Sequence, residues 1–455
     1  MQNRIGNEGY GNYFSLFSFV LVLQIILDLG IESYSRKEVA AYPHMVNRYL
    51  SGLLPVKVFL GLVYFIICTV VALFFNLSAF EWKLFFLLIA NQFMASAILF
   101  FRANLGGLQK FKAESVVSVL DRLILVVLIG AILYTSIFSV DISIVWFVLG
   151  QTIAYFVTLL VVMILLFRNV SFKGVELNLK RYVPILKGLL PFTFLVLLQS
   201  YYIRIDSVFL RTLLDDGKAQ AGIYAHAFRF LDYLSNYALL FPLLLLPIFS
   251  KSIKEKKDPI PLLLLSSQIL ILPSVIFLSS IFFYRHEIFD LIYDSHAVIS
   301  ADCFAILTVS FLGMCFSYTY GALLTANHNI NLLLKMSFVA AVISTVLNVI
   351  LIPRHQVIGA AIANCVAQLF TIFAHVILVQ KKFKNALNMF RVLKQLSLLL
   401  VLITLAWVIN QYVENIVQGV FLINVLGIGL LFALGIIRIS DIKQLLLKEV
   451  HERRK

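Results

Sequence analysis

Residues 51–76 read SGLLPVKVFLGLVYFIICTVVALFFN, a stretch in which Lys57 is the single charged residue. Each helical residue advances the chain by about 1.5 Å, so about 20 apolar residues cross the roughly 30 Å hydrocarbon core of a bilayer. The stretch is therefore long enough to cross a membrane as one helix. Windows of about 19 residues predict thirteen such spans in all, near 10–29, 51–76, 83–101, 115–138, 143–167, 186–209, 221–249, 261–283, 302–325, 334–353, 357–380, 393–409 and 418–437.

The composition fits this pattern. Hydrophobic residues make up 61% of the chain and charged residues 13%, and the 40 Phe and 19 Tyr suit lipid-facing and interfacial positions. A spanning backbone must satisfy its own hydrogen bonds, and helices do so within one segment. The sequence thus predicts an all-α polytopic membrane protein.

The basic residues predict its orientation. Cytoplasmic loops retain Lys and Arg during insertion, and one set of alternate loops plus the C-terminal tail holds 27 of them against 6 in the other set. We therefore expect a cytoplasmic C-terminus, and Met1 on the outside with an odd number of spans. The net charge of +14 needs no nucleic-acid partner.

The loops limit the possible functions. The longest connections, such as 30–50 and 284–301, have about 20 residues, too few for a soluble catalytic or nucleotide-binding domain. No cluster of acids and histidines indicates a catalytic site or a metal centre, and no cofactor is expected. The four cysteines have no paired spacing and are expected to be reduced. The sequence therefore favours a transporter over an enzyme.

An internal repeat indicates two pseudo-symmetric lobes. Gly11, Tyr13, Phe17 and Phe19 match a second set with the same spacing, namely Gly222, Tyr224, Phe228 and Phe230. Transporters commonly build alternating access from such repeats. We expect lobes at 1–167 and 184–380, a basic cytoplasmic linker at 168–183, and two further helices with a basic tail at 381–455.

Several short motifs carry a resemblance to a known family. The sequence contains Gly6-x-x-Gly9-Tyr10-Gly11-x-Tyr13, Asp28-Leu29-Gly30 with Arg36-Lys37-Glu38, Ile205-Asp206 followed by Gly222-x-Tyr224, and Leu347-Asn348 through Pro353 to Gly359-Ala360-Ala361-Ile362-Ala363. Together they resemble the Wzx-type polysaccharide flippases of the multidrug, oligosaccharidyl-lipid and polysaccharide exporter superfamily. The similarity extends over nearly the whole chain.

The resemblance implies two six-helix lobes, often with two more helices. It also implies flipping of an undecaprenyl-pyrophosphate-linked oligosaccharide to the outer leaflet. The chain starts where the second helix of that family starts, so we expect thirteen spans in place of fourteen, with the family's first helix missing.

Four cations fall within predicted spans: Lys57, Arg122, Arg204 and Arg229. A cation at the bilayer centre costs at least about 2.5 kcal/mol and tends to face a protein interior or a wet cavity. A pyrophosphate would supply the counter-charge, and the arginine fork suits its oxygens. Alternatively, these residues extend to the interface or pair locally.

Polar residues in the spans are candidates for cation coupling. Asp206, Asn348 and Asn364 offer oxygen ligands that suit Na+ or a proton relay. Ser337, Ser344 and Asn348 share one helix face by spacing, and Asn364, Gln368 and Thr371 share another. Hydrogen bonding between helices is the alternative for the two asparagines.

The sequence thus predicts a flippase in the bacterial inner membrane that works by rocking of the two lobes. Its expected partners are the lipid-linked oligosaccharide, membrane lipids and other polysaccharide assembly proteins. Two alternatives stay open: a cation-coupled multidrug or small-molecule exporter of the same superfamily, and a non-transporting scaffold of a polysaccharide assembly complex.

Overall fold

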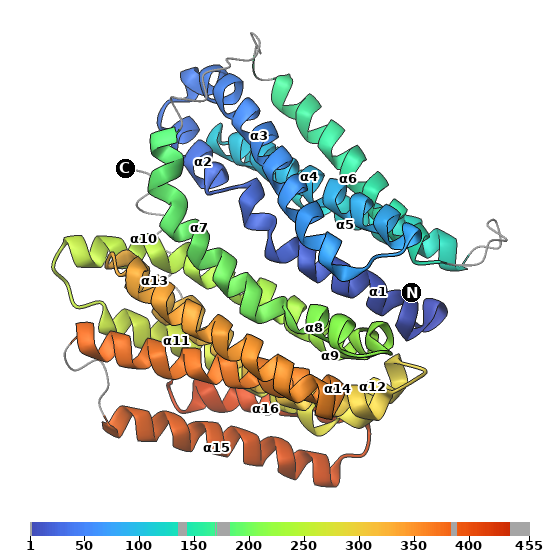
Figure 1. Cartoon of the computed structure of the whole chain (residues 1–455). Coiled ribbons are helices and arrows are strands. Elements are labelled where there is room, and N and C mark those ends of the chain that lie inside the picture. The colour runs from blue at the N-terminus through green and yellow to red at the C-terminus, as the bar shows by residue number, and fades with distance from the viewer. Residues whose placement is uncertain (1, 135–142, 169, 171–182, 384–388, 437–455) are drawn as a thin grey trace. The chain divides into compact units, whose positions relative to one another are not determined.

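A computed structural model describes residues 2–134, 143–168, 170, 183–383 and 389–436. All regular elements in these ranges are helices, so the predicted all-α class is confirmed (Figure 1). The basic tail beyond 436 and nearly all of the predicted linker 168–183 lie outside the described residues.

The predicted spans correspond to helices. In the described ranges, ten helices are long and apolar enough to cross a membrane, or up to eleven if the bent pair Gln2–Val22 and Gln24–Ala41 is one span. Helix α14 (Ile330–Lys382) contains two predicted spans, 334–353 and 357–380, on either side of a break at Gln356, where φ is 47°. Residues Ser397–Tyr412 form a shorter apolar helix at the predicted span 393–409.

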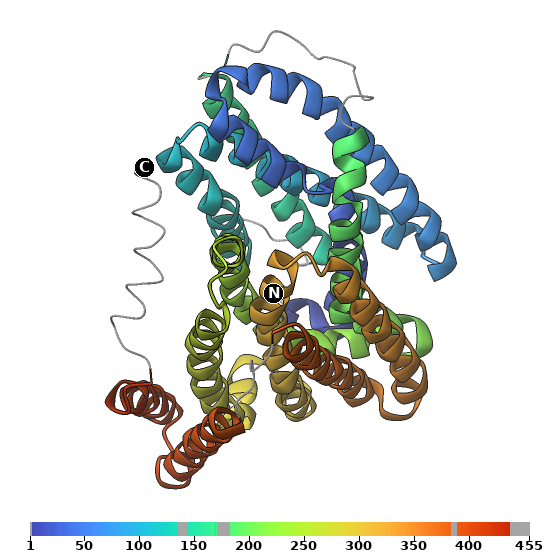
Figure 2. The same cartoon turned by 90° about the vertical axis from the view of Figure 1, so that its left-hand side faces the viewer.

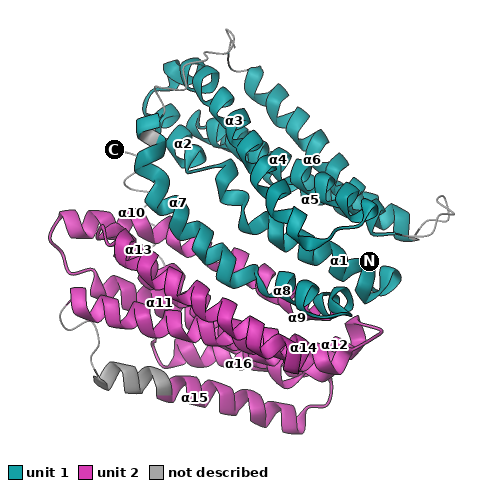
Figure 3. Cartoon of the chain, in the orientation of Figure 1, with its two compact units in different colours: residues 1–222 teal, residues 223–455 magenta. Residues whose placement is uncertain are grey.

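The chain divides into two compact units, residues 1–222 and 223–455 (Figure 3). Helices α7 and α8 lie in the first unit because they pack on α1. The boundary between the two compact units therefore falls about 40 residues after the predicted linker. The two lobes predicted from the sequence repeat are a different division of the chain and stay a prediction.

The first unit holds the following elements: α1 (Gln2–Val22), η1 (Gln24–Leu27), α2 (Ile31–Ala41), η2 (Pro43–Met45), α3 (Val46–Ala72), η3 (Leu73–Phe75), α4 (Ala79–Gly107), α5 (Phe111–Tyr134), α6 (Ile144–Phe167), α7 (Val183–Arg204), α8 (Asp206–Leu213) and the start of α9 (Gly217–Ala238). Its core includes Leu53, Phe101 and Leu166 from α3, α4 and α6. A capping box starts α4: Ser78 Oγ accepts from the Glu81 amide at 3.3 Å, and Glu81 Oε2 accepts from the Ser78 amide at 2.8 Å.

The second unit holds the rest of α9, then α10 (Leu240–Lys254), α11 (Ile260–Phe283), α12 (Arg285–Ile292), α13 (Ala297–Ala326), α14, α15 (Met389–Tyr412) and α16 (Ile416–Ala433). Helices α13 and α14 pack along one another, as both views show (Figure 1, Figure 2). The two C-terminal helices dock on α11 through Ile276, Leu402 and Ile423.

The repeated motif makes the same local contact in both copies. The rings of Tyr13 and Phe17 stack with centroids 5.4 Å apart, and those of Tyr224 and Phe228 stack at 5.5 Å. The two motif glycines also meet each other. A Cβ at Gly11 would lie 1.9 Å from the Lys218 carbonyl oxygen and 2.4 Å from the Gly222 nitrogen. Only glycine allows the middle of α1 and the start of α9 to approach this closely.

Candidate functional site

Lys57 is buried in α3 and paired with Asp28, which was not among the site residues predicted from the sequence. Its Nζ lies 3.1 Å from Asp28 Oδ1, and the Lys57 side chain is 4% exposed. The same carboxylate accepts hydrogen bonds from the backbone amides of Gly30 and Glu32, each at 3.1 Å. Asp28 therefore caps α2, whose N-terminal amides and dipole favour a negative charge.

This pair corresponds to the local pairing that was the alternative for Lys57. In this conformation its charge is balanced by Asp28, so Lys57 is available to a phosphate only if Asp28 releases it. The signal for Asp28 was present in the sequence, because Asp28 is the only charged residue of the predicted span 10–29.

A cavity of about 190 Å³ borders this pair. Its polar lining comes from η1, α2, α4 and α7, and consists of Gln24, Asp28, Glu32, Ser96 and Ser200. Arg36 lies 3.8 Å from Glu32 and 2.9 Å from Glu114, so cations accompany both acids of the lining. The cavity thus has a mixed polar and apolar lining, and a cation lies close to each of its two acids.

The three arginines selected from the sequence have different environments. Arg122 on α5 has an exposed side chain, whereas Arg204 at the end of α7 and Arg229 on α9 are half-buried. Asp206 begins α8, directly after the break that follows Arg204, and is fully buried. The structure thus gives Arg122 no interior position within its unit, while Arg204 and Asp206 flank a helix break.

A second buried ion cluster joins α1, α4, α8 and the start of α9. Arg211 Nη2 lies 2.8 Å from Glu81 Oε1, with side-chain exposures of 6% and 4%. Lys218 Nζ lies 2.7 Å from the same oxygen, and Arg211 also donates to Asn12 Oδ1 and Ser15 Oγ. Arg211 and Lys218 are two of the six basic residues counted in the loops expected outside. The sequence did not predict this cluster, because Glu81 and Arg211 are 130 residues apart.

The polar faces predicted on α14 are buried as the spacing indicated. Asn348 donates to the Ser344 carbonyl oxygen at 2.8 Å and to its Oγ at 3.3 Å. The six residues of the two faces are 0–1% exposed: Ser337, Ser344, Asn348, Asn364, Gln368 and Thr371. These side chains therefore point into the second unit and away from lipid.

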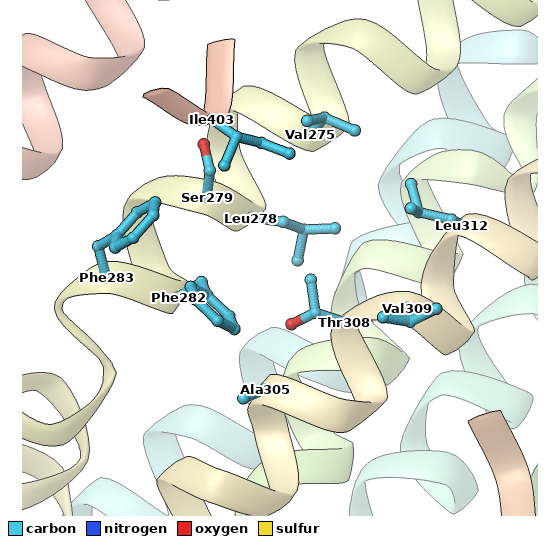
Figure 4. Close-up of a pocket in the computed structure, with 10 residues that line it drawn as sticks. All are labelled: Val275, Leu278, Ser279, Phe282, Phe283, Ala305, Thr308, Val309, Leu312 and Ile403. Atoms are coloured by element: carbon cyan, nitrogen blue, oxygen red, sulfur yellow. The ribbon is translucent and has the colours of Figure 1, made fainter. Parts of the chain in front are cut away.

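The second unit also has a partly open apolar cavity of about 220 Å³ (Figure 4). Its walls come from α11, α13 and α15, and include Leu278, Phe282, Ala305, Leu312 and Ile403. Only the hydroxyls of Ser279 and Thr308 bring side-chain oxygens to the lining, and Thr308 Oγ1 is already bonded to the Phe304 carbonyl oxygen at 2.9 Å. The cavity suits a hydrocarbon chain.

Among the described residues, no group of three or more His, Cys, Asp or Glu side chains lies in an arrangement that holds a metal ion. All four cysteines are free; Cys68, Cys303 and Cys315 are buried, and Cys365 is half-buried.

Apolar helices of membrane-spanning length that carry buried polar residues are typical of polytopic membrane transporters. The family of polysaccharide biosynthesis proteins matches residues 1–253 of the chain, and the chain belongs to this family. None of the curated proteins compared with the chain matches it.

Solved structures share the fold. The lipid II flippase MurJ in its inward closed conformation is 13% identical, with a TM-score of 0.69 over 95% of this chain and 94% of that chain. An inward-facing multidrug resistance MATE family transporter of the MOP superfamily is 15% identical, with a TM-score of 0.60 over 84% of this chain and 92% of that chain. A MOP superfamily transporter from Pyrococcus furiosus is 16% identical, with a TM-score of 0.57 over 82% and 88%. The chain therefore shares the fold of these structures, which are of a flippase and of transporters.

Proposed function

We propose that the protein is a flippase that moves an undecaprenyl-pyrophosphate-linked oligosaccharide across the bacterial inner membrane by alternating access. Membership of the polysaccharide biosynthesis family and the MOP fold support transport of a polysaccharide precursor. The observation that supports a lipid-linked cargo is the apolar cavity of the second unit.

The cavity favours an isoprenoid chain for a physical reason. Within a bilayer the hydrophobic effect gives a lipid tail no gain on entering a protein, because lipid is as apolar as Leu or Phe. Binding there depends on close packing, so a cavity bounded by Leu278, Phe282 and Leu312 selects a chain by shape. The cavity also reaches α15, one of the two helices outside the repeat.

The pyrophosphate is assigned to the intramembrane cations. Arg204 and Arg229 are the leading candidates, because both are half-buried at membrane depth. Lys57 joins them only in a state in which Asp28 has released it. Arg122 is the weakest of the four, because its side chain is exposed.

Coupling to Na+ or H+ is assigned to Asp206, Asn348 and Asn364. Asp206 at the start of α8 and the two asparagines on α14 are all fully buried, and a carboxylate or amide oxygen in such a position suits a cation. The distribution of Lys and Arg assigns the C-terminus to the cytoplasm. A cysteine introduced near the C-terminus and treated with a membrane-impermeant maleimide tests this assignment.

The main experiment fills the apolar cavity. Purified full-length protein in proteoliposomes is given a fluorescent lipid-linked oligosaccharide, and its appearance in the other leaflet is followed. Because overpacking costs about 1–3 kcal/mol, we expect Ala305→Phe to slow translocation about tenfold, the equivalent of 1.4 kcal/mol. Ala90→Phe on the exposed face of α4 is the matched control and keeps the wild-type rate. Equal rates for both variants argue against this cavity as the lipid site.

Charge reversal separates the other candidates. If Arg204→Glu and Arg229→Glu remove surface polysaccharide while the protein stays inserted, the flippase is supported. Intact polysaccharide with lost drug resistance favours the multidrug exporter of the same fold. Retention of all functions favours the scaffold.

A further inference from the structure

A buried polar seam runs between α13 and α14. On α13, Ser310, Gly313, Ser317 and Gly321 recur every three or four residues; on α14, Asn364, Gln368, Thr371 and His375 do the same. We call these eight residues the α13–α14 seam. A Cβ at Gly313 would lie 2.7 Å from Gln368 Oε1, and a Cβ at Gly321 would lie 3.3 Å from His375 Nε2. The two rows therefore face each other over about 16 Å of helix.

Small residues in such rows often serve close helix packing alone. The seam differs because several of its buried polar atoms lack a hydrogen-bond partner. These atoms are Ser310 Oγ, Ser317 Oγ, Gln368 Nε2 and His375 Nε2. Ser310, Gln368 and His375 are 0–1% exposed. Buried polar groups are nearly always paired, by protein or by ordered water, and lipid offers no substitute.

His375 is the titratable member of the seam, and its tautomer follows from its contacts. Nδ1 lies 2.7 Å from the carbonyl oxygen of Thr371. A carbonyl oxygen only accepts, so Nδ1 carries the hydrogen. In the neutral ring Nε2 then has the lone pair, and this is the atom that faces Gly321 without a donor.

We propose that the α13–α14 seam is a proton path, in which internal water molecules bridge the unpaired polar atoms and His375 accepts and releases the proton at Nε2. A hydronium in the file of water gives its proton to the Nε2 lone pair and becomes water; the reverse step returns it. No other bond changes. In the proposed flippase, the coupling ion would then be H+. The part of the inference that concerns transport rests on the proposed function, whereas the proton path itself does not.

His375 is the one residue of the α13–α14 seam that can take up a proton, and its surroundings among the described residues contain no competing group. Helix α13 is the element that packs extensively on α14 in the described residues. The α13 row that faces His375 has no titratable group; Cys315, Tyr318 and Tyr320 occupy other positions of the turn. The nearest cations along α14, Lys381 and Lys382, are exposed at its end. Water is thus the proton donor that the arrangement requires.

The first test needs no cargo. Full-length protein labelled with 15N-histidine is placed in lipid nanodiscs, and the imidazole signals are followed from roughly pH 5 to 8, the range in which histidine changes charge. The imidazole signal that is present in the wild-type spectrum and absent from the spectrum of His375→Gln belongs to His375. We expect Nδ1–H alone at high pH, a second proton at low pH, and cross-relaxation with water. An Nε2 that stays unprotonated and shows no water contact would overturn the proposal.

The second test measures coupling. A pH gradient across proteoliposomes is expected to accelerate flipping by the wild type, and His375→Gln should reduce this acceleration at least tenfold. His355→Gln, an exposed histidine on the same helix, is the matched control and should keep it. Gly321→Ala keeps the histidine but places a methyl group beside Nε2, so it should reduce the acceleration as well. If His375→Gln responds to the gradient as the wild type does, the proton path is refuted; if the wild type flips no lipid at all, the proposed cargo fails while the titration still tests the path.

Discussion

The ammonium group of Lys57 lies 3.1 Å from Oδ1 of Asp28, although the two residues are 29 positions apart. The pair joins α3 to the turn between η1 and α2. Lys57 is nearly fully buried and Asp28 is 26% exposed. The acid also accepts hydrogen bonds from the backbone amides of Gly30 and Glu32 at the start of α2, so the pair fixes how the chain enters that helix.

Breaking this pair should destabilise the protein. Asp28→Asn leaves the Lys57 ammonium buried without a counter-charge, which costs about 3 kcal/mol. Lys57→Met should cost less, because Asp28 keeps its two amide donors and some solvent. Chemical unfolding in detergent measures both. The double variant should lose less stability than the sum of the single ones; strictly additive losses would show that the two groups do not interact.

The Arg211 cluster gives a matched comparison. Glu81→Gln leaves the buried Arg211 without its carboxylate and should cost about 3 kcal/mol. Lys218→Met removes a cation from the same oxygen but should cost less than about 1 kcal/mol, because the Lys218 side chain is 41% exposed. The same unfolding assay ranks the two. A larger loss for Lys218→Met would contradict the assignment of Arg211 as the main partner.

The contact between Gly11 and Gly222 should not tolerate a side chain. A methyl group at Gly11 would meet the backbone of α9, which cannot move aside as a side chain can. We expect Gly11→Ala to lower the yield of folded, monodisperse protein severely. Gly130→Ala is the control, because a Cβ there has nothing within 4 Å. Ala at that position should be neutral or stabilise α5 by up to about 1 kcal/mol.

The docking of α16 depends on a similar close approach. Tyr284 donates from its hydroxyl to the Val413 carbonyl oxygen at 2.6 Å, and a Cβ at Gly419 would lie 2.0 Å from that hydroxyl oxygen. Tyr284→Phe should cost about 1 kcal/mol, the typical net value of one hydrogen bond. Gly419→Ala should cost more, since the ring must shift. Gly429→Ala, with nothing within 4 Å, should match the wild type in the same unfolding assay.

The membrane helices were predictable because crossing a bilayer is a local property. The stretch 51–76 needed only its own apolar residues to predict α3, which the structure places at Val46–Ala72. The break at Gln356 was also anticipated, since the predicted spans 334–353 and 357–380 leave a gap there. The compact units were not predictable in the same way, because the packing of α7 and α8 on α1 places the boundary at Gly222.

The buried charges show the limit of the sequence more sharply. Lys57 stood out by its position within an apolar stretch, but its partner did not. Arg211 and Glu81 lie near the ends of predicted spans and read as solvated charges, yet the structure buries both. A lone His375 in an apolar helix carried no signal until Gly321 and the unpaired atoms around it were located.

By itself, the sequence determined the helical class, the thirteen apolar segments and the repeated glycine motif, because these follow from the length, polarity and spacing of neighbouring residues. Only the tertiary structure decided which charges meet, that the two motif glycines touch, and that small residues of α13 face a polar row of α14. Such contacts join residues tens to hundreds of positions apart, so they depend on how the helices pack and not on any property of one segment.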